Sequence, residues 1–292
     1  MATSSRSDDA VRSLRDRFGW QTVAIYTLIT TYMLVLLVPL GEMFLTTLQS
    51  EGAVMSRTVF PRPNEFTLDN YVRILTYDRY QMFMRNSLII SFGTTAFTLL
   101  CGIPAAYALS RFDLRGGKAL LLIFLTTKML PAVLILIPFF GLMWWLGLVD
   151  THLGVILAHS VVALPLVIWL MKSYFDDIPR SLDDAAKMDG CSDLRILTKI
   201  ILPLAKPGIA VSAFWAFVTS WNDYLFVSII SRSQETRTLA VGLQMFQDLH
   251  STDWAGLMTG AVIMTIPLIL LFSYLQDWIM EGISSTGTGG VQ

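Results

Sequence analysis

The sequence predicts an all-α integral membrane protein with six transmembrane helices, and three observations support this fold class. Of the 292 residues, 54% are hydrophobic and only 15% are charged, whereas a soluble domain carries about 25% charged residues. The charges collect between long stretches that hold few or none. Six of these stretches can cross a bilayer, and each is expected to be a helix because a segment in lipid must satisfy its own backbone hydrogen bonds.

Each apolar segment is long enough for a hydrocarbon core about 30 Å thick, at about 1.5 Å of rise per residue. In chain order they cover residues 20–40, 86–109, 119–146, 153–174, 207–230 and 256–276. The first lacks a small-residue cleavage site, so we expect an uncleaved span rather than a signal peptide. The third contains Pro131, Pro138 and Gly141, which predict a kinked or partly unwound helix.

Lysine and arginine counts predict the orientation of the spans. Segments 1–19, 110–118 and 172–206 carry thirteen of these residues, and the opposite side carries seven. Both termini are therefore expected to be cytoplasmic, with loops 41–85, 147–152 and 231–255 outside. The predicted organisation is a cytoplasmic N-terminal segment, a six-helix transmembrane domain that includes external loop 41–85 and cytoplasmic loop 175–206, and a cytoplasmic C-terminal tail; these cover residues 1–19, 20–276 and 277–292.

Composition argues against several classes of function. The net charge of −1 gives no reason to expect a nucleic-acid partner. Cys101 and Cys191 are expected to be reduced, and His152, His159 and His250 are too scattered in the sequence for a metal site. No G-x-x-x-x-G-K-[ST] phosphate loop is present, and no loop is long enough for a catalytic domain. We therefore expect no catalytic residue, metal or bound cofactor, and any nucleotide hydrolysis must come from another polypeptide.

The predicted cytoplasmic loop 175–206 contains a short helix with a defined start and end. Ser181 is a good N-cap, and Asp184 lies three positions later, where a capping box places an acidic partner. Gly190 is a natural stop. These signals predict a helix over 182–189, followed by a second helix that Ser192 caps and that continues toward Leu202 and Pro203.

The small side chains of Ala185 and Ala186 permit the close approach of a partner. Such a helix could fit a groove on a soluble protein and transmit its movement. An amphipathic connector lying on the lipid surface is equally compatible with these residues alone.

The spacing within this loop resembles the coupling-loop signature of ABC importer permeases, E-A-A, three residues, G, nine residues, I-x-L-P. The chain reads Asp184-Ala185-Ala186, three residues, Gly190, nine residues, Ile200-Ile201-Leu202-Pro203. Aspartate at the first position keeps the charge of glutamate with a shorter reach. Trp221-Asn222-Asp223-Tyr224 is similar to a motif of the carbohydrate, MalG-like branch.

The resemblance implies a permease subunit that imports a sugar or oligosaccharide across a bacterial or archaeal cell membrane. Its implied partners are a second homologous permease, two ATPase subunits that bind ATP and Mg, an external sugar-binding protein or lipoprotein, and membrane lipid. Contact with the ATPase is implied for Asp184, Ala185, Ala186, Gly190, Leu202 and Pro203. The tail 281–290 resembles one that reaches the ATPase dimer interface, although its composition equally fits a frayed end.

Polar side chains inside spans are costly and usually have a role or a partner. Lys128 can line the substrate pathway, or it can extend its ammonium group toward the headgroups or pair within the bundle. Asn222 and Asp223 can touch substrate, or form a structural pair that fixes helix packing. His159 has no identifiable partner in the sequence, so packing is expected.

The alternative function is an ion-gradient-driven secondary transporter of a small polar solute. Such a protein usually shows an inverted repeat and acidic residues near the bilayer midplane. Segments 20–146 and 153–276 show no convincing repeat.

Overall fold

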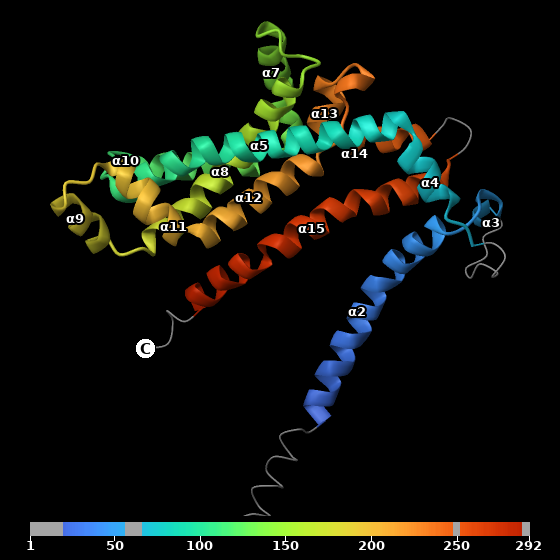
Figure 1. The fold of residues 1–292 in the computed structure, drawn as a ribbon, viewed down its shortest axis with the longest axis horizontal. Coiled ribbons are helices and arrows are strands. Elements are labelled where there is room, and N and C mark those ends of the chain that lie inside the picture. Colours follow the sequence, from blue (N-terminus) through green and yellow to red (C-terminus); the bar gives the residue numbers. More distant parts are fainter. Residues whose placement is uncertain (1–19, 56–65, 248–251, 288–292) are drawn as a thin grey trace, which may run out of the picture. The chain divides into compact units, whose positions relative to one another are not determined.

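The computed structural model of the protein describes residues 20–55, 66–247 and 252–287 (Figure 1). Within these ranges the chain is helical, and its extended pairing is confined to two isolated bridges. The predicted N-terminal segment 1–19 and the end of the predicted tail, 288–292, lie outside the described residues. Four helices are long and apolar enough to span a membrane, and up to six spans result if two bent helix pairs each count as one.

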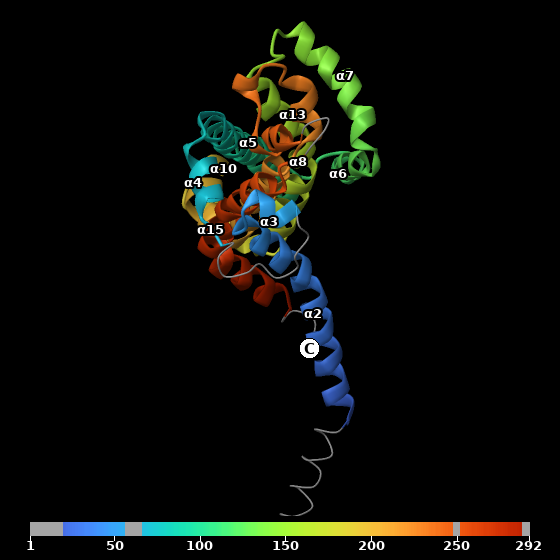
Figure 2. The same ribbon diagram turned by 90° about the vertical axis from the view of Figure 1, so that its right-hand side faces the viewer.

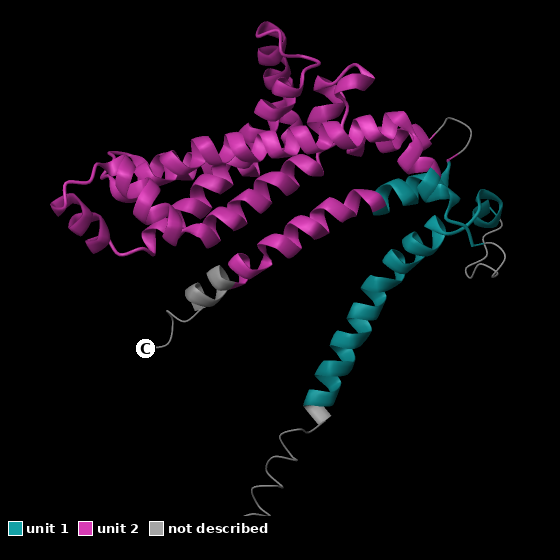
Figure 3. Ribbon diagram, in the orientation of Figure 1, with its two compact units in different colours: residues 1–72, 253–262 teal, residues 73–252, 263–292 magenta. Residues whose placement is uncertain are grey.

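The described chain divides into two compact units, shown in different colours in Figure 3. The first contains α2 (Trp20–Thr47), α3 (Glu51–Met55), the start of α4 (Asp69–Thr76) and the start of α15 (Trp254–Gly287). Along α2 nearly every described apolar side chain is exposed, as expected for a helix that faces lipid. The described residues of the segment predicted as external loop 41–85 thus form two short helices and the ends of two long ones.

Asn70 and Tyr71 fasten the end of α2. The Asn70 side-chain amide donates to the carbonyl oxygens of Thr47 and Gln49, at 2.9 and 2.8 Å. The Tyr71 hydroxyl lies 2.8 Å from the Thr47 hydroxyl. Because these amide bonds are buried, they satisfy carbonyl groups that the end of the helix would otherwise leave without donors.

The second unit is built around three helices that lie side by side, α5 (Asp78–Arg111), α8 (His152–Asp176) and α12 (Lys206–Trp221) (Figures 1 and 2). Small residues set their separation, as in many membrane bundles. A β-carbon added at Gly208 would lie 2.5 Å from the Tyr174 ring, and one added at Gly102 would lie 3.0 Å from Val167. Glycine at these positions therefore allows α8 to approach both neighbours closely.

The third predicted span is broken, as its prolines indicated. It consists of α6 (Gly117–Thr126), a short turn η2 (Thr127–Met129) and α7 (Ala132–Trp145), and the two halves meet at 104°. The break falls at Leu130-Pro131, where proline has no N–H to continue the helix and disfavours helical geometry in the residue before it.

One predicted helix was wrong in its extent. Residues 207–230 do not form one helix, because α12 ends at Trp221 and a separate α13 begins later (Leu225–Ile230). The helix that contains the last predicted span, α15, continues past residue 276 to Gly287, so the start of the predicted tail is helical. Contacts described below explain the break between α12 and α13.

A folded segment at the end of the bundle opposite α9 (Ser181–Met188) packs on α5 (Figure 1). It contains η4 (Gln234–Thr236), α14 (Leu239–Gly242) and η5 (Leu243–Phe246). The Asn86 amide donates to the carbonyl oxygens of Glu235 and Arg237, at 2.7 and 3.0 Å. The predicted loop 231–255 is therefore fastened to the second span rather than being a simple polar connector.

Asp150 fixes the same segment from the other side. It is the single non-glycine residue with positive φ in the described ranges, at 62°. One carboxylate oxygen, Oδ1, accepts hydrogen bonds from the backbone N–H groups of Arg232 and Ser233 and from the hydroxyls of Ser233 and Thr236. Burial alone would raise the pKa of Asp150, but these donors together hold the pKa below its usual value of 3.8.

The hydrogen bonds accepted by the Asp150 carboxylate predict that the stability of the fold depends on pH. Because the folded-state pKa is lowered, the stabilisation is present above about pH 4 and is lost as the pH falls through the folded-state value. Asp150→Asn is expected to lower the stability of the purified protein by about 1–2 kcal/mol at pH 7, since hydrogen bonds to a charged group are lost. Thermal unfolding between pH 3 and 7 measures this. The prediction fails if the variant and the parent lose the same stability on acidification.

Candidate functional site

The helix predicted in loop 175–206 is α9 (Ser181–Met188), which lies at one end of the bundle (Figure 1). The predicted start was wrong, because Ser181 is the first helical residue and no side chain caps the helix. The turn begins earlier, with the Leu182 N–H donating to the Pro179 carbonyl and the Asp184 N–H donating to the Arg180 carbonyl. Proline suits the first turn because its φ is already helical.

Gly190 ends α9 as predicted. Its φ is +78°, a conformation that side chains other than glycine rarely adopt. The Gly190 N–H donates to the Lys187 carbonyl, and the Cys191 N–H donates to the Ala186 carbonyl, both at 3.0 Å. These two bonds form a Schellman motif, which satisfies carbonyl groups at the end of the helix.

The second half of the loop is less regular than predicted. Ser192 occupies the N-cap position but makes no side-chain capping bond. The helix then passes from α10 (Asp193–Ile196) through a π-helical turn, η3 (Leu197–Ile201), into α11 (Leu202–Leu204). Leu202 packs against the buried core, whereas Pro203 is exposed.

The side chains of α9 divide into two faces. Asp183 and Ala186, three positions apart, are 5% and 6% exposed and point toward the bundle. Asp184 and Ala185 are exposed. Of the small residues singled out by the sequence pattern, Ala186 therefore fixes the helix to this chain, and Ala185 is available to a partner.

The ion pair of Asp183 with Arg111 was missed by the sequence analysis. Arg111 Nε lies 3.1 Å from Asp183 Oδ2, and the two side chains are 6% and 7% exposed. The Arg111 guanidinium also donates to the Ile178 carbonyl at 3.0 Å. The pair joins the end of α5 to α9. In the sequence, the one sign that Asp183 faces the bundle is its position three residues before Ala186, which places both side chains on the same face of the helix.

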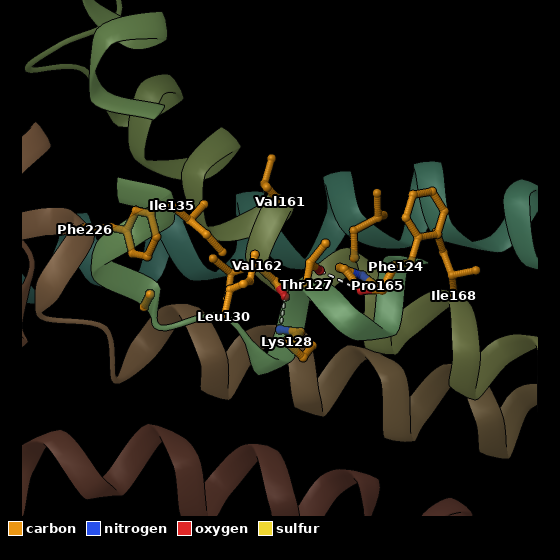
Figure 4. Close-up of a pocket in the computed structure, with 12 residues that line it drawn as sticks. Phe124, Thr127, Lys128, Leu130, Ile135, Val161, Val162, Pro165, Ile168 and Phe226 are labelled. Atoms are coloured by element: carbon orange, nitrogen blue, oxygen red, sulfur yellow. Dashed lines mark hydrogen bonds between the residues drawn. The ribbon is translucent and has the colours of Figure 1, made fainter. Parts of the chain in front are cut away.

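Lys128 lies at the break of the third span and lines a cavity of about 440 Å³ (Figure 4). Its ammonium group donates to the Val162 carbonyl on α8. The cavity walls are otherwise mostly apolar, with contributions from Ile135, Pro165 and Phe226. The lysine therefore brings a cation into an apolar recess and forms a hydrogen bond within the bundle.

Asp223 belongs to a buried polar network at the break after α12, and the expectation that His159 lacks a partner was wrong. His159 Nδ1 lies 2.7 Å from the Ser220 hydroxyl, and His159 Nε2 lies 3.1 Å from Asp223 Oδ2. The same carboxylate oxygen accepts the backbone N–H groups of Phe226 and Val227. Asp223 therefore caps α13, which explains why the span is interrupted there.

Asn222 is exposed and lies beside the network without joining it. Neither Asn222 nor Asp223 lines the cavity at Lys128. The three predicted pathway residues thus occupy two separate places in the fold.

Comparison with known proteins gives a consistent result. The family model described as "Binding-protein-dependent transport system inner membrane component" matches residues 98–285. The chain is 33% identical over 271 residues to the maltodextrin transport system permease protein MdxG of Bacillus subtilis, covering 92% of this chain and 96% of that protein. It is 36% identical over 243 residues to the galactooligosaccharides transport system permease protein GanQ of the same organism, covering 82% and 85%.

A solved structure agrees over almost the whole chain. It is the crystal structure of a bacterial ABC transporter involved in the import of the acidic polysaccharide alginate, one chain of which superposes with a TM-score of 0.79 at 28% identity. The match covers 91% of this chain and 98% of that one.

The described chain is an all-helical bundle with four long apolar helices, two bent helix pairs and a short helix, α9, held at one end of the bundle. Together with these comparisons, the fold defines a membrane transport subunit. The chain belongs to the family of binding-protein-dependent transport system inner membrane components. It is a multi-pass permease subunit of an ABC importer and not an enzyme.

Proposed function

We propose that this permease carries a sugar or oligosaccharide. The similar proteins named above transport maltodextrin, galactooligosaccharides and alginate. A related solute such as a glycerol phosphate is the main competing substrate. The cargo is delivered by an external sugar-binding protein or lipoprotein, in keeping with the binding-protein dependence in the family's description.

The proposed topology has six spans with both termini in the cytoplasm. The four long helices supply the first, second, fourth and sixth spans, the bent pair of α6 and α7 supplies the third, and α12 begins the fifth. The domain limits proposed from the sequence, 1–19, 20–276 and 277–292, follow from the same topology. The lysine and arginine excess on the side that contains α9 supports this orientation.

The proposed coupling role rests on one observation: one face of α9 is held by its own chain, and the other face is exposed. Asp183 and Ala186 hold the inner face. On the exposed side, Met188 is 89% exposed, and Leu194 in the following turn is 71% exposed. Apolar side chains outside the spans favour a protein partner. We assign this partner as an ATPase subunit, contacted through Asp184, Ala185 and the Gly190 turn, with Leu202 and Pro203 continuing the segment into the membrane.

The proposed assembly contains a second homologous permease and two ATPase subunits, with lipid around the bundle. ATP and Mg bind to the ATPase subunits, and this chain binds no cofactor. Closure of the ATPase pair moves α9, and the bundle then opens to the outside. Lys128 lines the substrate pathway, Asn222 faces it, and Asp223 positions α13.

Met188→Asp tests the coupling role. It places a charge on the exposed face and is expected to reduce ATPase co-purification at least tenfold, with unfolding stability changed by less than about 0.5 kcal/mol. Arg115→Asp is the matched control, because Arg115 is exposed in loop 112–116 on the same proposed membrane side. Equal ATPase recovery with the two variants, measured by affinity purification of the tagged permease, would refute the contact.

A further inference from the structure

A second cavity lies between the ends of α5 and α8 and the start of α6. Its volume is about 400 Å³, within the range of small-ligand sites. Four basic and two acidic side chains line it: Arg111, Lys118, Lys172, Arg180, Asp113 and Asp176. The cavity therefore carries an excess of positive charge, and none of the sequence motifs accounts for it.

Two of these cations are not neutralised by the protein. Lys172 pairs with Asp176, and Arg111 pairs with Asp183 outside the cavity lining. Arg180 donates to a neutral group, the Ser110 carbonyl, at 2.7 Å. Lys118 is exposed and makes no hydrogen bond or ion pair with the residues that the structure describes. A lysine and an arginine thus remain able to bind an external anion.

The surroundings of the cavity indicate where that anion comes from. The cavity lies where the apolar helices α5 and α8 end. In the proposed topology, this is the depth of the lipid headgroups on the cytoplasmic side. Lys118 belongs to α6, which continues into the exposed apolar residues Leu122 and Ile123, 64% and 61% exposed. A free phosphate would contact only the cations, whereas a lipid would contact the cations with its headgroup and the apolar surface of α6 with its acyl chains.

We propose that this cavity binds the phosphate headgroup of an anionic membrane lipid, with Lys118 and Arg180 contacting the phosphate and the acyl chains lying along α6. Basic pockets between transmembrane helices on the cytoplasmic side are suited to such headgroups. Because Arg180 immediately precedes α9, the bound lipid steadies the start of that helix. The lipid site depends on the membrane location of the chain and not on the identity of the transported solute.

The test uses the full chain purified with the subunits it assembles with, and measures bound lipid by native mass spectrometry. Phosphatidylglycerol and phosphatidylcholine with identical acyl chains are added in turn. We expect phosphatidylglycerol to be retained preferentially and Lys118→Ala to lower its occupancy about fivefold, the effect of one cation near an anionic headgroup. Lys118→Arg keeps the charge and is expected to retain the lipid. Lys199→Ala removes an exposed cation outside the cavity and is expected to have no effect.

Four results would overturn the proposal. The first is equal retention of the two lipids, and the second is equal occupancy in Lys118→Ala and Lys199→Ala. The third is complete displacement of phosphatidylglycerol by inorganic phosphate, which would make this a site for a soluble anion. The fourth is loss of an ATPase subunit from Lys118→Ala with the lipid retained, which would make it a protein contact. Since each readout is lipid occupancy or subunit content, failure here leaves the transport proposal untouched.

Discussion

Asp183→Ala is expected to detach α9 from the bundle and abolish the coupling of ATP hydrolysis to uptake. The substitution leaves the Arg111 guanidinium buried without its counter-ion, and breaking one side of a buried ion pair typically costs about 3–5 kcal/mol. Arg111 keeps its bond to the Ile178 carbonyl, so the lower end of that range is expected. Thermal unfolding and substrate-stimulated ATP hydrolysis of the assembled transporter measure the two consequences.

Two further variants distinguish the loss of the buried ion pair from the general effect of removing a charge. Asp184→Ala removes an exposed neighbouring carboxylate and should change unfolding stability by less than about 0.5 kcal/mol. Arg111→Leu combined with Asp183→Leu removes both buried charges and should recover part of the stability lost in the single variant. If Asp183→Ala were as stable as Asp184→Ala, the ion pair would not be what holds α9.

His159→Leu is expected to lower stability by about 2 kcal/mol and to slow uptake. The change removes the donor to the Asp223 carboxylate and the partner of the Ser220 hydroxyl, and leaves both in a largely buried place. With less support for Asp223, the cap of α13 weakens, and the helices that surround the cavity at Lys128 lose a fixed neighbour. Unfolding in detergent and uptake by reconstituted vesicles provide the two measurements.

His159→Gln retains a hydrogen-bond donor and an acceptor, so it should recover part of the unfolding stability and part of the uptake rate. His152→Leu is the matched control at the start of α8, because the His152 Nε2 atom has no hydrogen-bond partner within the described chain. An effect of His152→Leu as large as that of His159→Leu would show that the network is not the cause.

The all-helical fold could be predicted because composition and segment length act locally. A long apolar segment in lipid must form a helix to satisfy its own backbone hydrogen bonds. Pro131 predicts a break because proline has no backbone N–H to donate. The stop at Gly190 was equally predictable, since positive φ is a property of the residue itself.

The interruption at residues 222–224 could not be predicted in this way. It depends on Asp223 meeting His159 from a helix more than sixty residues earlier in the chain, as well as on local capping. The Asp183–Arg111 pair also joins distant segments, and the turn at Pro179 displaced the expected cap at Ser181. Sequence signals located the short helix in loop 175–206, but only tertiary contacts show which of its residues face inward.

The two broken spans have a shared consequence. The α7 half of one and the α13 half of the other touch through the edge-to-face rings of Phe139 and Phe226, and Leu136 joins them in one buried cluster. Each half is separated from the rest of its own span by a break. The same cluster includes Ile90 of α5 and Val155 and Ala158 of α8, so both segments pack on the long helices as well as on each other. A displacement of either segment therefore disturbs an apolar cluster that α5, α7, α8 and α13 share, and these helices are expected to respond to it together.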